Sequence, residues 1–382
     1  MGVLIHNATA LDANGRVDNA WVHSSGKMIA ATGVGGGWTA EKDDVILDAS
    51  GAWLVPGFID LHVHGGGGHS FHDDGQSIQK ALAAHRTHGT TRSLISLVTT
   101  PPAAVRQQLE TISTLMAHDS LILGAHLEGP FLSPLHKGAH DPQLLMEPAA
   151  QTVQSLLETS NGVIRQITLA PELPGAADAI DRFVEAGIIV AIGHTDVDYD
   201  GARKAFDQGA RLLTHGFNAM RGIHHRHPGP VLAAFDDPRI VIELIADGIH
   251  IDPRVISMAF QQAPGRIALV TDAMAAAGSA NGTYRLGSQP VEVKGNRAVL
   301  TGTDTIAGST LTQDRALAYA IDTVGLQPAA AVAALTQTPA RALGLENEFG
   351  LLSAGYRPDF VLLDHHWNVQ GVWADGERLT RA

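Results

Sequence analysis

Residues 56–68 read PGFIDLHVHGGGG, a short apolar run that leads into two histidines and four glycines. The run is flanked by proline and glycine, which predicts a buried strand that ends in a loop. Residues two apart on a strand point to the same face, so His62 and His64 can direct two imidazoles at one point. Such a pair is typical of a metal site, because histidine is the commonest metal ligand at neutral pH. Two histidines that merely pack at a strand end are the alternative, and ligands elsewhere in the chain must decide between the two.

The composition limits the kinds of site that the chain can build. Its 382 residues, 45% of them hydrophobic, suffice for one large domain or for a large and a small one. It contains no cysteine, which excludes disulfides and thiolate metal ligands. Any metal site must therefore use histidine, aspartate and glutamate, and the 20 histidines leave that option open. The formal net charge of -13 argues against general binding of nucleic acid.

The sequence carries no sign of export or of a membrane span. The first residues, MGVLIHNATALDANG, lack the basic segment and the long apolar run of a secretory signal peptide. No apolar stretch approaches the length that crosses a bilayer. We therefore expect a cytoplasmic protein without a membrane partner.

Short strand-like segments at both ends of the chain predict a small β domain. Turn-rich pieces such as Asp12–Gly15 separate these segments, a pattern that is common in hairpins and sandwiches. Because short strands need partners to bury one face, we expect residues 1–55 and 358–382 to form one small β-sandwich domain. The segments are 3–5, 20–22 and 45–47 near the start, and 360–363 and 369–372 near the end.

In residues 56–357, apolar runs alternate with helix-like segments, which predicts an α/β fold, a (β/α)8 catalytic barrel. Continuous apolar runs are typical of parallel strands that are buried on both faces. Periodicity alone does not separate a closed barrel from an open, doubly wound sheet. The predicted strands are 58–64, 93–98, 121–126, 166–170, 188–192, 212–214, 241–246 and 267–270, and the predicted helices are 78–88, 103–116, 176–186, 199–208, 253–262, 311–324 and 328–343.

Histidine, glutamate or aspartate follows six of these apolar runs, at the point where each run ends. In a barrel these ends meet at one face, which is where active sites lie. Taken singly, each residue is more often a loop or core residue than a ligand, but six strand ends together favour a metal site. The residues are His62 and His64, Glu128, His194, His215, His250 and Asp272.

The chemistry of these residues suits catalysis. Imidazole and carboxylate groups bind zinc, iron, manganese and related divalent ions. A bound divalent cation lowers the pKa of its water to near 7 and polarises a carbonyl group. Asp272, at the end of the last strand, is then placed to accept a proton from that water and to pass it to a leaving group.

Several stretches of the sequence form a series of motifs. They are PGFIDLHVHG (56–65), HLEGPF (126–131), GAHDP (138–142), APE (170–172), GHT (193–195), THGFNAM (214–220), ADGIH (246–250), VTDAM (270–274) and the segment Gly350–Asp364. In this order they resemble the amidohydrolase superfamily and, within it, the N-acetylglucosamine-6-phosphate deacetylases. HxH alone is a weak motif, whereas LEGPF, HGFNAM and ADGIH together are specific. The resemblance covers essentially the whole chain and implies a metal-dependent enzyme that releases acetate from an amino-sugar phosphate.

The resemblance implies one or two divalent ions per chain, with zinc expected and iron, manganese, cobalt or cadmium as alternatives. Asp272 matches the catalytic acid/base, which also contacts the metal. Glu128 matches a bridging position that a carboxylated lysine occupies in many amidohydrolases, so we expect no modified lysine. The ligands implied for the first ion are Glu128, His194 and His215, and those added for a second ion are His62 and His64.

The resemblance also assigns residues to the substrate. Asn218 and Ala219 match residues whose backbone groups hold the phosphate, which favours N–H groups or a guanidinium fork. Arg226 matches an arginine that reaches the phosphate held by a neighbouring subunit, which implies a homodimer. Residues 221–227 contain two arginines and three histidines, and a solvated basic loop is the alternative interpretation. The residues matched to the sugar are Ala139, His140 and His250.

Two further kinds of function remain open. A related amidohydrolase would act on N-acetylgalactosamine 6-phosphate or on a cyclic amide, and assays with these substrates separate the possibilities. A non-catalytic sugar-phosphate sensor on the same fold is expected to lose Asp272 or a metal ligand, and this sequence retains all of them.

Overall fold

The computed structural model describes residues 2–379. The chain divides into two compact units, one of Met1–Asp60, Ala83–Arg92 and Thr312–Ala382 and the other of Leu61–Leu82 and Ser93–Leu311. The predicted domains have their boundaries after residues 55 and 357, and they follow the division between the small β domain and the barrel instead. These boundaries stay a prediction.

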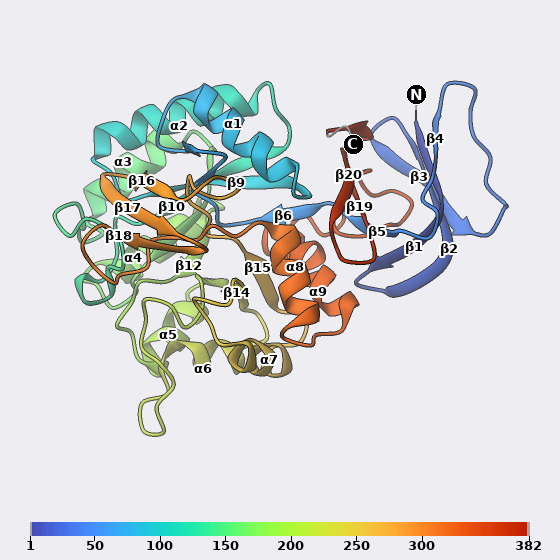
Figure 1. Ribbon diagram of the computed structural model, residues 1–382. Helices are drawn as coiled ribbons and strands as arrows, with labels where there is room; N and C mark the ends of the chain where they lie inside the picture. Colours follow the sequence, from blue (N-terminus) through green and yellow to red (C-terminus); the bar gives the residue numbers. More distant parts are fainter. Residues whose placement is uncertain (1, 380–382) are drawn as a thin grey trace. The chain divides into compact units, whose positions relative to one another are not determined.

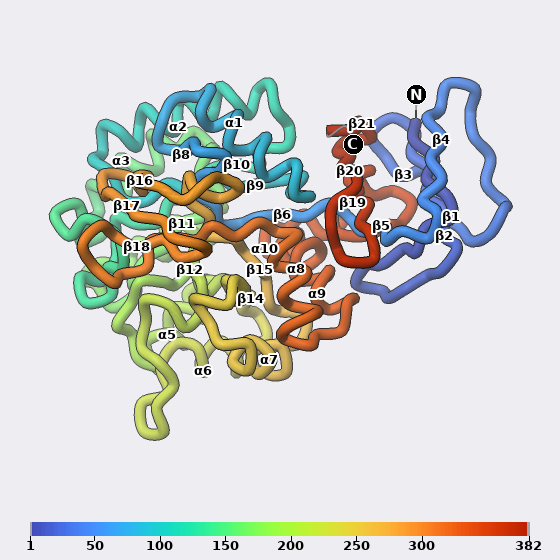
Figure 2. Tube along the Cα trace, in the orientation of Figure 1, coloured from blue at the N-terminus to red at the C-terminus, as the bar shows by residue number. Residues whose placement is uncertain are grey.

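Both ends of the chain contribute strands to one mostly antiparallel sheet (Figures 1 and 2). Strand β1 pairs with β2 along one edge, whereas its other edge pairs first with β4 and then with β5, so the sheet forks there. The antiparallel pairing of β19 with β5 joins the C-terminal strands to the N-terminal ones. The predicted sandwich is therefore built from one forked sheet. Its strands are β1 (Val3–Asp12), β2 (Gly15–Ser25), β3 (Met28–Val34), β4 (Val45–Asp48), β5 (Trp53–Pro56), β19 (Phe360–Leu363), β20 (Val369–Ala374) and β21 (Glu377–Arg378).

A second sheet holds eight strands that neighbour one another in sequence order, as expected for a barrel. Adjacent strands from β9 to β15 pair in parallel, and every residue of β9 and β14 is buried. Just beyond the first and last strands, Val63 and Ala273 form a parallel bridge, which brings those strands together and favours a barrel over an open sheet. The strands are β6 (Phe58–Asp60), β9 (Thr90–Val98), β10 (Ile122–Glu128), β11 (Ile164–Leu169), β12 (Ile189–Ile192), β13 (Leu212–Leu213), β14 (Val241–Ile245) and β15 (Ile267–Val270).

Helices alternate with these strands, and most predicted helices lie within a few residues of their observed ends (Figure 1). They are α1 (Gly75–Arg86), α2 (Pro102–Met116), α3 (Ala150–Ser160), α4 (Ala176–Glu185), α5 (Tyr199–Asp207), α6 (Gly229–Phe235), α7 (Pro253–Gln262) and α8 (Gln313–Asp322). Aspartates cap two of them, since Asp198 accepts from the backbone N–H of Gly201 and Asp252 from that of Arg254. Within residues 2–379, no helix combines the length and apolar character that a membrane crossing requires.

Two helical features differ from the sequence prediction. Helices α3 and α6 were not predicted, and the helix predicted for 328–343 is divided into α9 (Pro328–Leu335) and α10 (Gln337–Ala342). Thr336 between them has the non-helical dihedrals φ -131 and ψ -80. Pro339 explains the break, because its ring would clash with the carbonyl of Leu335 in a continuous helix.

A three-stranded antiparallel sheet between β15 and α8 was also not predicted. Its strands are β16 (Gly282–Leu286), β17 (Gln289–Lys294) and β18 (Arg297–Leu300). Val291 and Val293 are buried and pack in one apolar cluster with Met274, directly after the end of β15. Two features of the sequence indicate these hairpins, namely the alternating apolar residues and the turn glycines Gly287 and Gly295, which both have positive φ.

Candidate metal centre and active site

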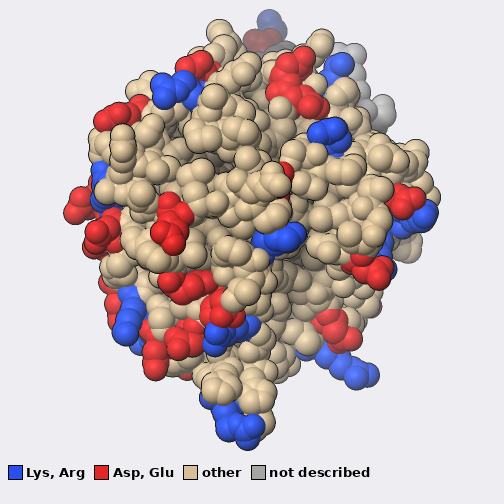
Figure 3. All heavy atoms as spheres, turned by 90° about the vertical axis from the view of Figure 1, so that its left-hand side faces the viewer, with Lys and Arg blue, Asp and Glu red and all other residues tan. Residues whose placement is uncertain are grey.

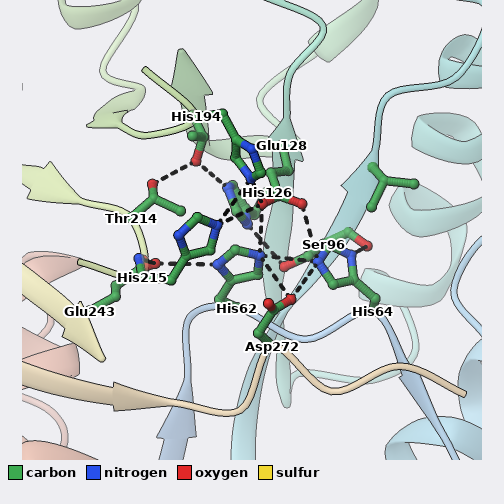
Figure 4. A network of polar contacts seen from close by, with 12 residues as sticks. His62, His64, Ser96, His126, Glu128, His194, Thr214, His215, Glu243 and Asp272 are labelled. Atoms are coloured by element: carbon green, nitrogen blue, oxygen red, sulfur yellow. Dashed lines mark hydrogen bonds and ion pairs between the residues drawn. The ribbon is translucent and has the colours of Figure 1, made fainter. Parts of the chain in front are cut away.

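The six side chains predicted to bind metal converge beyond the C-terminal ends of the barrel strands (Figure 4). They form two groups, and within each group the ligand atoms lie within 4.8 Å of one another. Each of the six residues is buried. The first group is His62, His64 and Asp272, and the second group is Glu128, His194 and His215.

The backbone turns sharply where three of these ligands leave their strands. His194, His215 and Asp272 follow β12, β13 and β15 and have φ values of 47, 29 and 47. Residues other than glycine seldom adopt this left-handed conformation, and such strain is concentrated at functional sites. The strained positions therefore single out the same strand ends that the sequence singled out by residue type.

Glu128, the last residue of β10, joins the two groups through its two carboxylate oxygens. Its Oε1 lies 2.9 Å from Nε2 of His194 and 3.2 Å from Nε2 of His215. Its Oε2 lies 3.3 Å from Nε2 of His64. This position between the groups agrees with the bridging role that the resemblance implies for Glu128.

Hydrogen bonds at the outer nitrogen determine which histidine nitrogen faces the site. Nδ1 of His64 lies 3.1 Å from the backbone oxygen of Ser96, and Nδ1 of His194 lies 2.8 Å from that of His136. Because a carbonyl oxygen only accepts, both Nδ1 atoms must carry the proton. In the neutral ring, each Nε2 then offers a lone pair to the site, as is usual for metal-binding histidine.

The spacing of these nitrogens tests whether the site suits a cation. Nε2 of His62 and Nε2 of His64 are 3.0 Å apart, and the Nε2 atoms of His194 and His215 are 3.1 Å apart. Two lone pairs at this distance repel each other unless a proton or a cation lies between them. Neutral imidazoles with buried carboxylates are the donors that zinc and related divalent ions bind, so both groups fit such an ion.

The two carboxylates of the site are ionised. Burial would raise the pKa of Asp272, but the neighbouring His62 and His64 hold it at about 2. Burial would likewise raise the pKa of Glu128, yet His62, His140 and His194 hold it well below its usual range. Both groups therefore present negative charge to the site at neutral pH.

A cavity of about 320 Å³ opens onto the two groups. Asp272 and Glu128 contribute to its lining, which also contains the residues predicted to contact substrate, with one exception. Those residues are Ala139, His140, Asn218, Ala219 and His250. The turn between β16 and β17, with Ser288, and the single-turn helix η1 (Pro134–His136) also line the cavity, and neither was predicted.

Arg226 is the exception, because it is exposed and does not line the cavity of its own chain. It lies in the loop between β13 and α6, where His224 and His227 form an antiparallel bridge. This loop extends beyond α5 and α6 at the lower left of Figure 1. On the face shown in Figure 3, the lower protrusion ends in Lys or Arg side chains, while elsewhere basic and acidic side chains are interspersed.

Two cavity histidines are held by acidic residues. Nδ1 of His250 lies 2.7 Å from the carboxylate of Asp247, which leaves Nε2 available to a ligand. Burial would lower the pKa of His250, but Asp247 raises it above the usual value. His140 lies with Nε2 3.3 Å from Oε2 of Glu128 and with Nδ1 3.0 Å from the hydroxyl of Thr99.

A buried polar layer beneath the ligands was missed in the sequence. His126 lies with its two ring nitrogens 3.0 Å from the hydroxyl of Ser96 and 2.8 Å from that of Thr168. Burial lowers the pKa of His126 well below its usual value, so its ring is neutral. Glu243 lies behind His62, inside the fully buried strand β14. A charged residue within an apolar run, as in VIELI, was the signal available for it.

Comparison with known proteins relates this geometry to a family. Residues 53–379 match the amidohydrolase family. The chain is 38% identical over 328 residues to N-acetylgalactosamine-6-phosphate deacetylase of Escherichia coli O157:H7, covering 85% of this chain and 87% of that protein. It is 37% identical over 343 residues to N-acetylglucosamine-6-phosphate deacetylase of Bos taurus, covering 86% and 84%.

Among solved structures, the fold is similar to a mutant N-acetyl-D-glucosamine-6-phosphate deacetylase from Mycobacterium smegmatis in complex with N-acetyl-D-glucosamine-6-phosphate. The two chains share 40% sequence identity with a TM-score of 0.93, and the match covers 100% of each.

Proposed function

Because this chain belongs to the amidohydrolase family, we propose that it hydrolyses the acetamide of N-acetylglucosamine 6-phosphate to glucosamine 6-phosphate and acetate. The position of Asp272 carries the proposal. This ionised carboxylate lines the cavity and lies 3.1 Å from Nε2 of His64, next to a bridging glutamate. An amide hydrolase needs such a group to move a proton between water and the leaving amine.

The metal is a divalent ion, with zinc as the expected identity and iron, manganese, cobalt or cadmium as alternatives. When bound, it activates water and polarises the acetamide carbonyl. Glu128, His194 and His215 would hold one ion, His62, His64 and Asp272 would hold a second one, and the carboxylate of Glu128 lies next to both groups.

The residues of this chain then perform the proton transfers. Asp272 accepts a proton from the attacking water as its oxygen bonds to the carbonyl carbon of the acetamide. It returns that proton to the amine nitrogen as the carbon–nitrogen bond breaks, so that acetate and a free amine leave. His140 and His250 line the cavity and hold the sugar.

Lysine or arginine commonly binds phosphate, and within residues 2–379 the lining of this cavity offers neither. Ala219 lines the cavity, and within that range its backbone N–H has no acceptor, so this N–H can donate to the phosphate. Arg221 is bound to Asp196, which leaves Arg226 as the arginine of the loop that can serve a neighbouring subunit. A homodimer with Arg226 acting across its interface would complete the site.

A phosphorylated substrate also supports a cytoplasmic location, because a dianion does not cross a bilayer unaided. N-acetylgalactosamine 6-phosphate is the second candidate substrate, since the relative from Escherichia coli O157:H7 carries that name.

The test is acetate release by the purified, metal-replete protein. We expect faster turnover of N-acetylglucosamine 6-phosphate than of N-acetylgalactosamine 6-phosphate, and little turnover of unphosphorylated N-acetylglucosamine. The reverse order for the two phosphates would favour the second candidate. Binding of both without acetate release would favour a sensor and reject the enzyme.

A further inference from the structure

Glu243 is a buried carboxylate for which the proposed mechanism has no role. It lies in the interior of β14, and its residue is 0% exposed. Its Oε2 lies 3.3 Å from Nδ1 of His62 and accepts the backbone N–H of His215 at 3.4 Å. Its Oε1 accepts from the amide of Gln166 at 3.0 Å. Glu243 therefore contacts two ligand residues, His62 and His215 (Figure 4), and the amide of Gln166, which orients the carboxylate.

We propose that Glu243 is a positioning residue that sets the tautomer and ring orientation of His62 and so creates the binding site of the second metal ion. This inference rests on the proposed two-ion site. A buried carboxylate is stable only where donors satisfy it. Nδ1–H of His62 is one of its donors, so the neutral ring carries its lone pair on Nε2, which lies 3.0 Å from Nε2 of His64.

His62 differs from the other ligand histidines in what holds it. The Nδ1 atoms of His64 and His194 face backbone carbonyls, which no side-chain substitution removes. Nδ1 of His215 has no hydrogen-bond partner within residues 2–379. Nδ1 of His62 instead faces the side chain of Glu243, which is distant in sequence, so this contact can be tested by mutation.

The charge of Glu243 acts in the same direction. A carboxylate hydrogen-bonded to the outer nitrogen of a ligand histidine makes the inner nitrogen a stronger donor. Glu128 and Asp272 line the cavity, where within residues 2–379 no lysine or arginine lies, and Glu243 is a third buried carboxylate behind His62. Divalent cations compensate this buried charge.

Three substitutions separate the contributions of shape, hydrogen bonding and charge. Glu243→Leu removes the acceptor at similar size. Glu243→Asp keeps the charge but withdraws the carboxylate from His62 by one methylene. Glu243→Gln keeps an acceptor for Nδ1, and the unpartnered Oε1 of Gln166 can accept its new amide after rotation of the Gln166 amide.

The experiment measures zinc content per chain and the affinity of each ion by competition with a chelator. Wild type should bind two ions. Glu243→Leu and Glu243→Asp should weaken one ion about 10- to 100-fold, the usual effect of removing an outer partner of a ligand, and leave the other within about threefold. Glu243→Gln should restore most of the lost affinity.

Thr214→Val is the matched control, because it removes a buried hydroxyl contact to Thr168 without touching a ligand side chain. Both ions should bind this variant as they bind wild type.

A double-mutant cycle tests whether His62 transmits the effect. In a His62→Asn background, the Glu243 substitutions should cause no further loss of metal affinity. Equal weakening of both ions, or two ions at wild-type affinity in the Leu and Asp variants, would overturn the inference while the proposed function stands. A wild type that binds one ion at most would instead reject the two-ion site itself. If Glu243→Leu does not fold, as judged by circular dichroism, the Asp and Gln variants decide the matter.

Discussion

The two ligand groups differ in what holds them, although Glu128 joins them. In the second group, the backbone carbonyl of His136 orients His194. In the first group, the side chain of Glu243 orients His62 across 181 residues of sequence. The first group also needs the first and last barrel strands to meet, because the backbone N–H of Asp272 donates to the carbonyl of His62. Contacts between residues far apart in sequence hold both groups, but a backbone carbonyl orients His194 in the second group, whereas a side chain orients His62 in the first.

The difference implies that the ion of the second group is the more robust of the two. A backbone carbonyl persists in any variant that folds, whereas a single side chain can be removed. We expect the first group to lose its ion first when the site is perturbed. The predictions that follow concern the two groups and the substrate site beside them, from the largest expected effect to the smallest.

Asp272→Asn should lower kcat about 10²- to 10⁴-fold, the range for a positioned acid/base, because an amide cannot accept the proton. Substrate should still bind, as measured by equilibrium dialysis. Metal content must be measured in parallel, since Asp272 lies in the first group. Near-normal turnover in this variant would show that Asp272 is not the catalytic acid/base.

Glu128→Gln should weaken both ions by more than about 100-fold, which exceeds the effect of an outer partner, because its two oxygens contact both groups. His194→Asn is the matched variant and should weaken mainly the ion of the second group. Chelator competition on both proteins checks this. If Glu128→Gln affects only one ion, the carboxylate does not bridge.

Joint replacement of His62 and His64 by Asn should leave one ion per chain, held by Glu128, His194 and His215. Zinc analysis after dialysis against metal-buffered solution measures the count. Loss of both ions would show that the second group depends on the first, contrary to the difference in how the groups are held. If the wild-type protein binds only one ion per chain at metal excess, the two ligand groups do not each bind an ion and cannot be compared in this way.

Arg226→Ala should raise KM for the phosphorylated sugar about tenfold or more, the effect of losing one hydrogen bond to a charged group. Neither ligand group should change, so metal content stays as in wild type. KM for unphosphorylated N-acetylglucosamine should be unaffected, because that sugar lacks the group that Arg226 holds. An equal rise for both sugars would contradict a phosphate contact.

The action of Arg226 across an interface has its own test. Mixing Arg226→Ala chains with Asp272→Asn chains should restore part of the activity, because a mixed dimer has one site with both residues intact. Subunit exchange must be verified with differently tagged chains. If chains exchange and activity does not return, Arg226 serves its own chain or has no such role.

Much of the barrel and the grouping of the ligands could be predicted, because both depend on local signals. A buried strand reads as a run of apolar residues, and a polar residue directly after the run marks the strand end, as with His194 after β12 and His215 after β13. Parallel strands then bring these ends to one face. The catalytic and binding roles of the individual residues follow from resemblance and stay predictions.

The features that were missed depend on contacts rather than on periodicity. Glu243 and His126 lie within apolar strands, where a single polar residue reads as an interruption. Their partners come from other strands, as with Thr168 of β11 for His126. The sheet β16–β18 was not predicted, because it interrupts the alternation of strands and helices that indicates a barrel; its turn glycines were the local signal.

By itself, the sequence determined that alternating strands and helices form the barrel region and that six candidate metal ligands lie where strands end, because hydrophobic periodicity and residue type are local properties. Only the tertiary structure decided that the strands close into a barrel, that Glu128 lies between two groups, and that Glu243 holds His62. Those facts depend on which side chains meet across the barrel, and distances between residues far apart in the chain are set by packing rather than by the pattern along it.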